Sequence, residues 1–153
     1  MRRFGILSDT HGLLRPQVLE MLQGCEKILH AGDVGKASIL EALGHIAPVI
    51  AVRGNVDEGG ELSALPATVE GDLDGVPFAM THRREDAPAS WRRGAELVIF
   101  GHSHRPEMDW FGKCLYLNPG AAGPRRFSLP LSLALIHVAP DRRWFPEILA
   151  IRA

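Results

Sequence analysis

Short apolar runs that stop abruptly in small polar residues recur along the chain. Their lengths, β-branched content and glycine-containing exits are typical of buried strands. They cover residues 4–7, 28–29, 49–52, 76–80 and 97–100. Apolar residues at helical spacing, each set followed by a glycine, predict helices at 16–23 and 36–43 between the first three runs. This strand–helix alternation predicts parallel pairing through right-handed crossovers in the first third of the chain.

Beyond Pro66 the pattern changes to short β-like segments separated by glycine and proline, with one short helix expected at 87–93. The end of the chain predicts a hairpin in which 131–138 turns at Pro140-Asp141 into 144–151. Together these elements predict an α/β fold class, a layered β-sandwich flanked by helices. No internal repeat or linker interrupts the pattern, so we expect a single domain of residues 1–153.

Composition narrows the functional classes. The chain has 153 residues, 46% hydrophobic and 23% charged, as in ordinary globular domains and unlike disordered chains or coiled coils. Its 17 basic and 18 acidic residues leave a formal charge of -1, which gives no strong nucleic-acid signal and no attraction to anionic membranes. No apolar run approaches the roughly 20 residues of a spanning helix. Two isolated cysteines form no disulfide framework, and we expect a cytoplasmic protein.

The polar side chains at the strand exits carry the candidate chemistry. They are Asp9, His11, Asp33, Asn55, His82, His102 and His104. Imidazole nitrogens with carboxylate and amide oxygens, and no thiolate, favour Mn, Fe, Zn, Ni or Co over an all-oxygen calcium site. Within Asp9-Thr10-His11 and His102-Ser103-His104, residues two apart on an extended segment point the same way, so each pair is expected to converge.

The ordered set Asp9-x-His11, Gly32-Asp33, Gly54-Asn55, His82 and Gly101-His102-x-His104 resembles the calcineurin-like metallophosphoesterase superfamily. More narrowly it is similar to the small stand-alone phosphodiesterases of bacteria and archaea, whose fold is shared by a retromer scaffold subunit. Asn118-Pro119-Gly120 also resembles a stretch of that family. The resemblance implies an αββα arrangement of layers.

It also implies a dinuclear metal site, with Mn as the first choice of metal. Asp9, His11 and His104 would hold one ion, Asn55, His82 and His102 the other, and Asp33 would bridge both. The implied reaction is hydrolysis of a small phosphoester, most simply a phosphodiester, by a hydroxide that bridges the metals and attacks phosphorus. Asp33, Asn55 and His82 would then be catalytic through the metals.

Two departures from the family bear on the substrate. Many members have histidine directly after the Gly-Asn pair, whereas this chain has Val56, which cannot donate a proton. No general acid is identified, so the enzyme should either favour esters with good leaving groups or use another proton donor. After the single His82 the family usually has glycine, and this chain has Arg83. Its guanidinium either holds a phosphate or extends into solvent. Asn55 and Arg83 are the candidate substrate-binding residues.

Several alternatives stay open. A non-catalytic scaffold like the retromer subunit shares the fold, and a nuclease is disfavoured by the neutral overall charge. Asp57 either pairs with Arg53 or orients a ligand histidine. His30, His45 and His137 match no ligand position, although His30 lies near the predicted site. The tryptophans are expected in the core or in the interface of a homo-oligomer.

Overall fold

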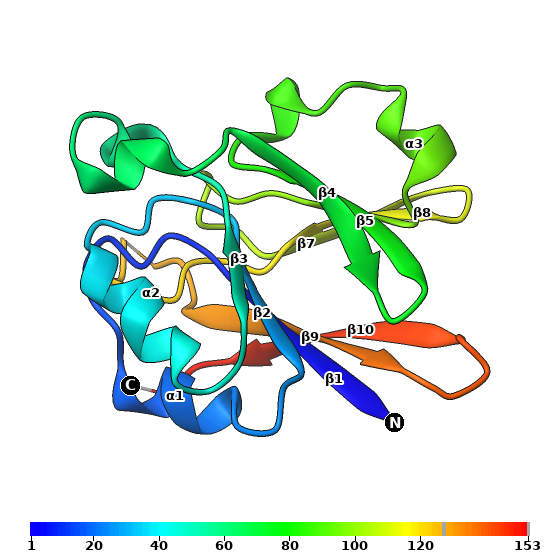
Figure 1. Ribbon diagram of the computed structural model, residues 1–153, viewed down its shortest axis with the longest axis horizontal. Helices are drawn as coiled ribbons and strands as arrows, with labels where there is room; N and C mark the ends of the chain where they lie inside the picture. Colours follow the sequence, from blue (N-terminus) through cyan, green and yellow to red (C-terminus); the bar gives the residue numbers. More distant parts are fainter. Residues whose placement is uncertain (127, 153) are drawn as a thin grey trace.

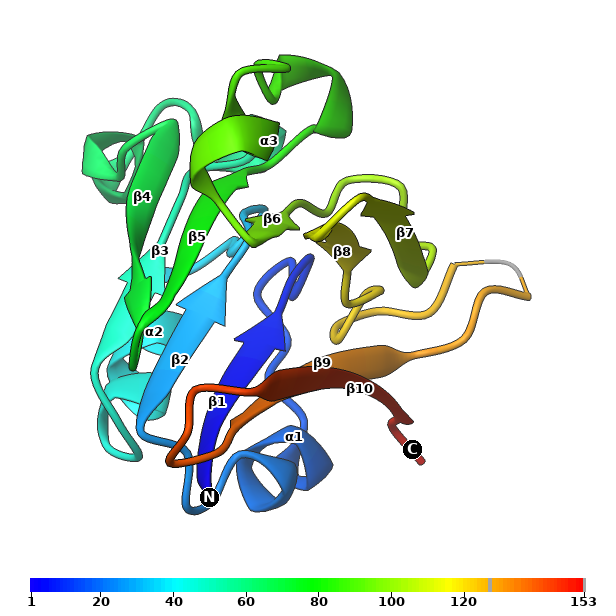
Figure 2. The same ribbon diagram turned by 90° about the vertical axis from the view of Figure 1, so that its right-hand side faces the viewer.

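The structure is a computed structural model that describes residues 1–126 and 128–152, so Phe127 and Ala153 of the expected 1–153 domain lie outside the described part. Two five-stranded sheets pack face to face (Figures 1 and 2). In the first sheet the strand order is β10-β9-β1-β2-β3, and β1, β2 and β3 run parallel. Its strands are β1 (Arg2–Leu7), β2 (Lys27–His30), β3 (Val49–Ala51), β9 (Ser132–Val138) and β10 (Trp144–Ala150).

The second sheet has the order β4-β5-β6-β8-β7, with β5, β6 and β8 parallel and the two outer strands antiparallel. Its strands are β4 (Thr68–Leu73), β5 (Val76–Thr81), β6 (Leu97–Ile99), β7 (Glu107–Phe111) and β8 (Cys114–Asn118). Helices α1 (Pro16–Met21) and α2 (Ala37–Gly44) connect the parallel strands of the first sheet. The short helices η3 (Arg84–Asp86) and α3 (Trp91–Gly94) belong to the segment of the chain that connects β5 to β6.

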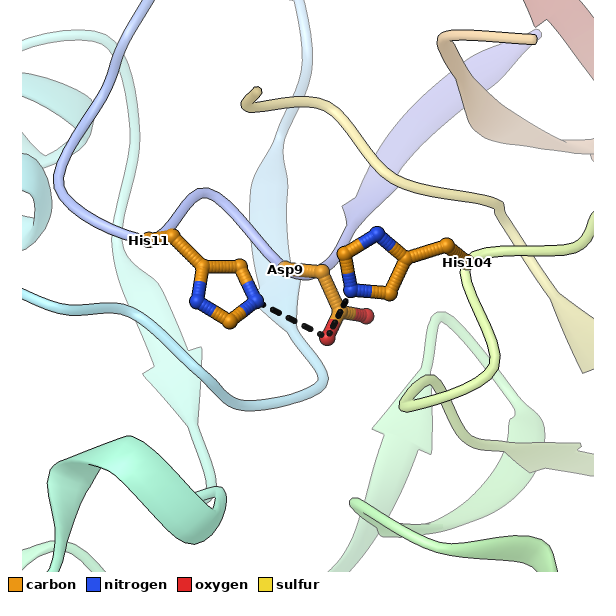
Figure 3. A group of neighbouring side chains, drawn as sticks. All are labelled: Asp9, His11 and His104. Carbon is orange, nitrogen blue, oxygen red and sulfur yellow. Dashed lines mark ion pairs between the residues drawn. The ribbon is translucent and has the colours of Figure 1, made fainter. Parts of the chain in front are cut away.

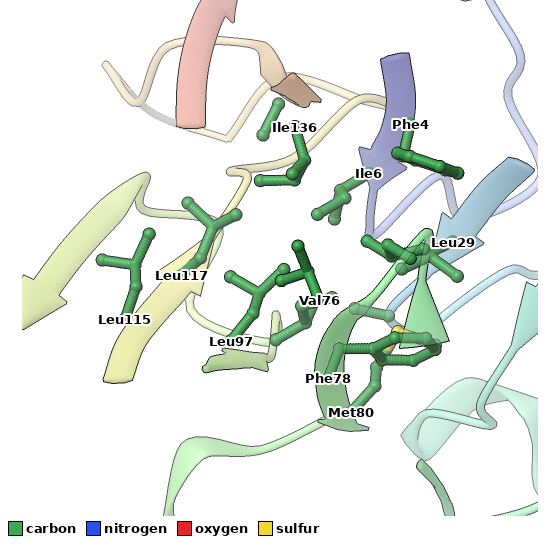
Figure 4. Packing of buried hydrophobic residues seen from close by; sticks show 14 of the residues in the cluster. Phe4, Ile6, Leu29, Val76, Phe78, Met80, Leu97, Leu115, Leu117 and Ile136 are labelled. Atoms are coloured by element: carbon green, nitrogen blue, oxygen red, sulfur yellow. The ribbon is translucent and has the colours of Figure 1, made fainter. Parts of the chain in front are cut away.

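The main core fills the space between the sheets. Figure 4 shows Phe4, Ile6 and Leu29 of one sheet facing Phe78 and Met80 of the other, all at most 2% exposed. A second apolar cluster packs α1 and α2 on the outer face of the first sheet, and a third packs α3 on the outer face of the second. The helices therefore lie on opposite sides of the sandwich (Figure 1), and the predicted α/β sandwich flanked by helices is confirmed.

The predicted elements match the structure except in one region. The five apolar runs all lie in or next to strands, the helices at 16–23 and 36–43 form with ends shifted by one or two residues, and the terminal hairpin is present. The single helix expected at 87–93 is wrong, because a 3-10 turn ends at Asp86 and α3 begins only at Trp91. Ala87 precedes Pro88 and is extended, as steric conflict with the proline ring requires.

The candidate residues follow strands that run parallel within each sheet, so the exits of one sheet lie along one edge. The exits of both sheets meet at one end of the sandwich, where the candidate side chains come together.

In the described part of the chain, no helix has the length and apolarity needed to cross a membrane.

Candidate metal centre

Backbone hydrogen bonds fasten the strand-exit loops to one another. The N–H groups of Asp9 and His11 donate to the carbonyl oxygens of Gly32 and Asp33, at 3.0 and 2.9 Å. In the second sheet, the N–H of Gly101 donates to the carbonyl oxygen of His82 at 2.9 Å. The side chains that follow are therefore held in fixed relation by the backbone of neighbouring loops.

The local conformation of these loops differs from the expectation. Asp9 and His11 have φ values of 55° and 46°, and His102 and His104 have 73° and 64°. The prediction of an extended segment is wrong, since all four residues lie in the left-handed region. Such residues each cost of order 1 kcal/mol or more and are retained where the surrounding structure holds them. The paired side chains converge because the backbone turns sharply at each of them.

The first group of side chains comprises Asp9, His11 and His104 (Figure 3), and their ligand atoms all lie within 4.8 Å of one another. Oδ1 of Asp9 lies 3.7 Å from Nε2 of His11 and 3.4 Å from Nε2 of His104. Asp9 is fully buried and His104 is 3% exposed. A carboxylate and two imidazoles at this spacing form a set that can hold one divalent cation.

The second group comprises Asp33, His82 and His102, again with ligand atoms within 4.8 Å of one another. Oδ2 of Asp33 lies 3.2 Å from Nε2 of His82 and also 3.6 Å from Nε2 of His11 in the first group. The Asp33 carboxylate thus faces both groups. His102 is exposed, so this side of the site is open to solvent.

Unsatisfied polar atoms occur on the residues of both groups, and Asp9 Oδ1, His11 Nε2 and His82 Nε2 face the site. Among the described residues, the buried atoms without a hydrogen-bond partner are Asp9 Oδ1, His11 Nε2, His82 Nε2 and His104 Nδ1. Buried polar atoms are normally satisfied, and an exception calls for an explanation such as an ion. All of them belong to the residues that the sequence assigns to metal binding. The donor set present therefore fits first-row divalent cations.

The groups around Asp9 and Asp33 lower the pKa values of both carboxylates. Burial alone would raise the pKa of Asp9, but the neighbouring His104, His11 and Ser8 outweigh it and hold this pKa well below its usual value. Burial likewise opposes ionisation of Asp33, while His82 and the Val56 N–H lower its pKa. Both carboxylates are therefore ionised at neutral pH, as metal binding requires.

His82 has its ring orientation fixed by the backbone. Its Nδ1 lies 2.7 Å from the carbonyl oxygen of Ala31, which only accepts, so Nδ1 carries the proton and Nε2 faces the site. Burial would lower the pKa of His82, but the neighbouring carboxylates of Asp33 and Asp9 raise it in the metal-free protein. In the neutral ring, the Nε2 lone pair is directed at the cation position.

Close packing explains the glycines beside two of these residues. A Cβ atom on Gly54 would collide with the backbone and carboxylate of Asp33, and one on Gly101 would collide with the Ser8 hydroxyl and the Asp9 carboxylate. Ser8 Oγ in turn donates to Asp9 Oδ2 at 2.6 Å, and the His102 N–H donates to the same oxygen at 3.1 Å. The second oxygen of Asp9 is thus satisfied, which leaves Oδ1 directed into the site.

Asn118 supports the His102–His104 loop from β8. Its Nδ2 donates to the Gly101 carbonyl oxygen and to Ser103 Oγ, both at 3.1 Å, and its Oδ1 accepts the Gly120 N–H at 2.9 Å. The sequence marked this residue only as part of a family resemblance, and Ser8 not at all. Both are fully buried polar residues at strand ends, a signal that burial alone makes visible.

Asp57 has neither of the two expected roles. Its carboxylate accepts the N–H groups of Val34, Gly35 and Gly54, at 3.1, 3.0 and 2.9 Å. The predicted pair with Arg53 does not form, because the Arg53 guanidinium donates to the carbonyl oxygen of Leu65 at 2.8 Å. Asp57 instead joins the loop that carries Asp33 to the loop that carries Asn55.

His30 also lies beneath the site, on β2, and is fully buried. Its Nδ1 accepts the Gly32 N–H at 3.1 Å, so the proton resides on Nε2 and is directed to Thr10 Oγ1 at 3.0 Å. Thr10 in turn donates to the Val34 carbonyl oxygen at 2.8 Å. This chain of bonds uses the neutral ring, and burial lowers the pKa of His30 to about 4.

We expect His30 to make the metal-free protein sensitive to mild acid. Between its unfolded pKa of 6.5 and its folded pKa of about 4, the unfolded chain binds a proton that the folded chain does not. The free energy of unfolding should therefore fall by about 3 kcal/mol as the pH is lowered through this range, with no contribution above it. Urea unfolding across this pH range measures the effect.

The His30→Gln variant should show a correspondingly weaker pH dependence than the unmodified chain. His45→Gln is the matched control, because His45 is exposed and its removal should leave the dependence unchanged. Equal pH dependence in His30→Gln and the unmodified chain would contradict the assignment of a neutral buried His30.

Asn55 and Arg83 lie together at a cavity of about 230 Å³ next to the second group. Asn55 is exposed and begins the turn η1 (Asn55–Asp57), and His82 also lines the cavity. Arg83 is half-buried. All predicted site residues thus lie at or beside one site.

Comparisons with known proteins agree with this geometry. The family model described as the calcineurin-like phosphoesterase superfamily domain matches residues 2–141. The chain is 28% identical over 143 residues to a probable metallophosphoesterase of Methanothermobacter thermautotrophicus, covering 86% of this chain and 83% of that one. It is 27% identical over 163 residues to phosphodiesterase YfcE of Escherichia coli K12, covering 89% and 88%. The fold matches vacuolar protein sorting 29 of Cryptosporidium parvum, with a TM-score of 0.76, 19% identity and 97% of each chain covered.

Proposed function

The chain belongs to the calcineurin-like phosphoesterase superfamily and is a metal-dependent phosphoesterase, and from this premise we propose that it hydrolyses phosphodiesters at a centre of two divalent ions. Asp9, His11 and His104 would hold the first ion. Asn55, His82 and His102 would hold the second, and Asp33 would serve both. The position of the Asp33 carboxylate, 3.6 Å from His11 and 3.2 Å from His82, supports this assignment.

The buried, unsatisfied polar atoms of the site are the main support for the proposal. The buried atoms that lack a hydrogen-bond partner among the described residues belong to four of the seven proposed ligands. When bound, the two ions supply Lewis-acid activation of the phosphoryl group and an activated water at neutral pH. The chain itself fixes the ligand orientations through Ser8, Ala31 and Asn118 and keeps the carboxylates ionised.

The residue next to Asn55 limits the range of leaving groups. Val56 is 52% exposed and has no group that transfers a proton. Proton donation by a general acid contributes about 10²- to 10⁴-fold, so the enzyme should favour esters whose leaving groups depart unprotonated. A small phosphodiester with an acidic alcohol fits this requirement, and Asn55 and Arg83, which line the neighbouring cavity, would contact its phosphoryl oxygens.

The test is hydrolysis of bis(p-nitrophenyl) phosphate by chelator-treated protein after separate addition of Mn, Zn, Co, Ni or Fe. We expect no turnover without metal and restored turnover with at least one ion, with Mn as the first candidate. Absence of turnover with every metal, in protein that is folded by circular dichroism, would contradict the proposal.

The second candidate is a scaffold without activity, which the fold match to vacuolar protein sorting 29 and the exposed Met108, Trp110 and Phe145 favour. The complete donor set and its unsatisfied atoms support the enzyme instead. We further propose one domain over residues 1–153, a cytoplasmic location and, through the exposed aromatic residues, a homo-oligomer. Sedimentation of the purified protein measures the oligomeric state.

A further inference from the structure

The cavity of about 230 Å³ lies beside the second group of candidate ligands. Asn55 and His82 form part of its wall, whereas Asp9, His11 and His104 do not line it. It therefore opens from the side of the site where His82 lies. A substrate with its phosphorus at the metal centre would place one substituent here.

Two arginines, Arg53 and Arg83, line this cavity. Both residues are half-buried, and within the described residues neither has a carboxylate within the 4.0 Å of an ion pair. Arg53 has one hydrogen bond, to the neutral carbonyl oxygen of Leu65, and the Arg83 side chain has none in the described part. Two positive charges are therefore partly removed from water without compensation.

The acidic residues at the cavity form no ion pair with Arg53 or Arg83 among the described residues. Glu58 and Asp86 also line it, but both are exposed to solvent and neither is paired with an arginine. Arg84, which follows Arg83 in the chain, shows the contrast, because it binds Glu107 at 2.8 Å and Asp109 at 2.7 Å. Guanidinium groups of this kind bind phosphate or carboxylate through paired, charge-assisted hydrogen bonds.

We propose that Arg53 and Arg83 bind a second anionic group of the substrate, separate from the phosphoryl group that reacts. The substrate class is then a phosphoester whose substituent carries another phosphate or a carboxylate. This inference rests on the proposed function and narrows it. It assigns a specificity role to Arg53, whose position in the sequence carried no such signal, and it extends the role of Arg83 beyond the reacting phosphate.

Inhibition of bis(p-nitrophenyl) phosphate hydrolysis tests the proposal. The probes are glycerol 3-phosphate, with one anionic group, glycerol 1,3-bisphosphate, with a second phosphate, and 3-phosphoglycerate, with a carboxylate. At constant ionic strength, a second anionic group should lower the inhibition constant about tenfold or more, which exceeds the twofold statistical advantage of two equivalent phosphates. The two probes with a second anionic group distinguish phosphate from carboxylate as the preferred group.

The readout is the ratio of inhibition constants, which does not depend on the remaining activity of a variant. In Arg83→Gln and in Arg53→Gln the advantage of the second anionic group should shrink towards one. Arg93→Gln is the matched control, because Arg93 is exposed on α3 and should keep the full ratio. Chelation of free metal by the bisphosphate would persist in both cavity variants and is thereby separated from binding.

Two outcomes would overturn the inference. One is a ratio near two or below for both probes with a second anionic group in the unmodified enzyme, and the other is a large ratio that both cavity variants retain. In either case hydrolysis of bis(p-nitrophenyl) phosphate would still support the proposed function. Failure of that hydrolysis with every metal would instead contradict the proposed function itself.

Discussion

Replacement of Asp33 by Asn is expected to abolish metal-dependent hydrolysis and to weaken metal binding by about three orders of magnitude. The carboxylate faces His82 at 3.2 Å and His11 at 3.6 Å, so its charge acts on both halves of the site. A unit charge about 4 Å from another contributes about 4 kcal/mol at an effective dielectric constant of about 20. Elemental analysis after gel filtration and the rate with bis(p-nitrophenyl) phosphate measure the two effects.

The fold should survive this substitution, because Asn retains a side-chain oxygen for the Val56 N–H that Asp33 accepts at 3.0 Å. Asp74→Asn is the matched control, since Asp74 lies in the turn between β4 and β5 and contacts Arg2. Its metal content and rate should equal those of the unmodified enzyme. Full metal loading and activity in Asp33→Asn would contradict the assignment of Asp33 to both ions.

Replacement of Asp57 by Ala is expected to destabilise the protein by about 3 kcal/mol or more. The substitution leaves three N–H groups, of Val34, Gly35 and Gly54, without their acceptor, and the Val34 and Gly54 groups are buried. Each unsatisfied buried donor costs about 1–3 kcal/mol. Urea unfolding of the metal-free protein measures the change, and metal affinity should fall as well because the Asp33 and Asn55 loops lose their connection.

Glu58→Ala provides the matched control for this experiment, because Glu58 is the exposed neighbouring carboxylate. Its free energy of unfolding should change by less than about 0.5 kcal/mol, as is usual for surface substitutions. A similar small change in Asp57→Ala would show that Asp57 does not carry the connection between the loops.

The candidate ligands could be identified from the sequence because the order and direction of the strands bring the residues at their exits together. Asp9, Asp33 and Asn55 follow strands of one sheet, and His82 and His102 follow strands of the other. Parallel neighbours end at the same edge, so polar residues after successive apolar runs become neighbours in space. The apolar runs predicted the strands that precede these residues well enough to place the exits.

Features that depend on packing in three dimensions could not be predicted. The left-handed backbone of His11, His102 and His104 is stabilised by the surrounding loops, and no local signal distinguishes it from an extended segment. Two of the three acceptor bonds of Asp57 reach Val34 and Gly35, more than 20 positions away in the sequence. The charge imbalance around Arg53 and Arg83 depends on which carboxylates reach them, which spacing in the sequence does not reveal.

The overall charge of -1 also has a different meaning once the site is known. The candidate ligands include two buried carboxylates with lowered pKa values, which concentrate negative charge where the donor atoms converge. Binding of two divalent ions would reverse this local charge, and Arg53 and Arg83 lie beside it. An anionic substrate is thus attracted locally without a basic surface overall.

The number of divalent ions bound per chain tests most directly whether this site is a centre of two metal ions. Metal-free protein would be titrated with Mn by calorimetry, and the bound metal counted by elemental analysis after removal of the excess. We expect two ions per chain, and we expect hydrolysis of bis(p-nitrophenyl) phosphate to appear only as these ions bind. A chain that binds one ion or none at saturation, or that hydrolyses the ester equally well without metal, would contradict it.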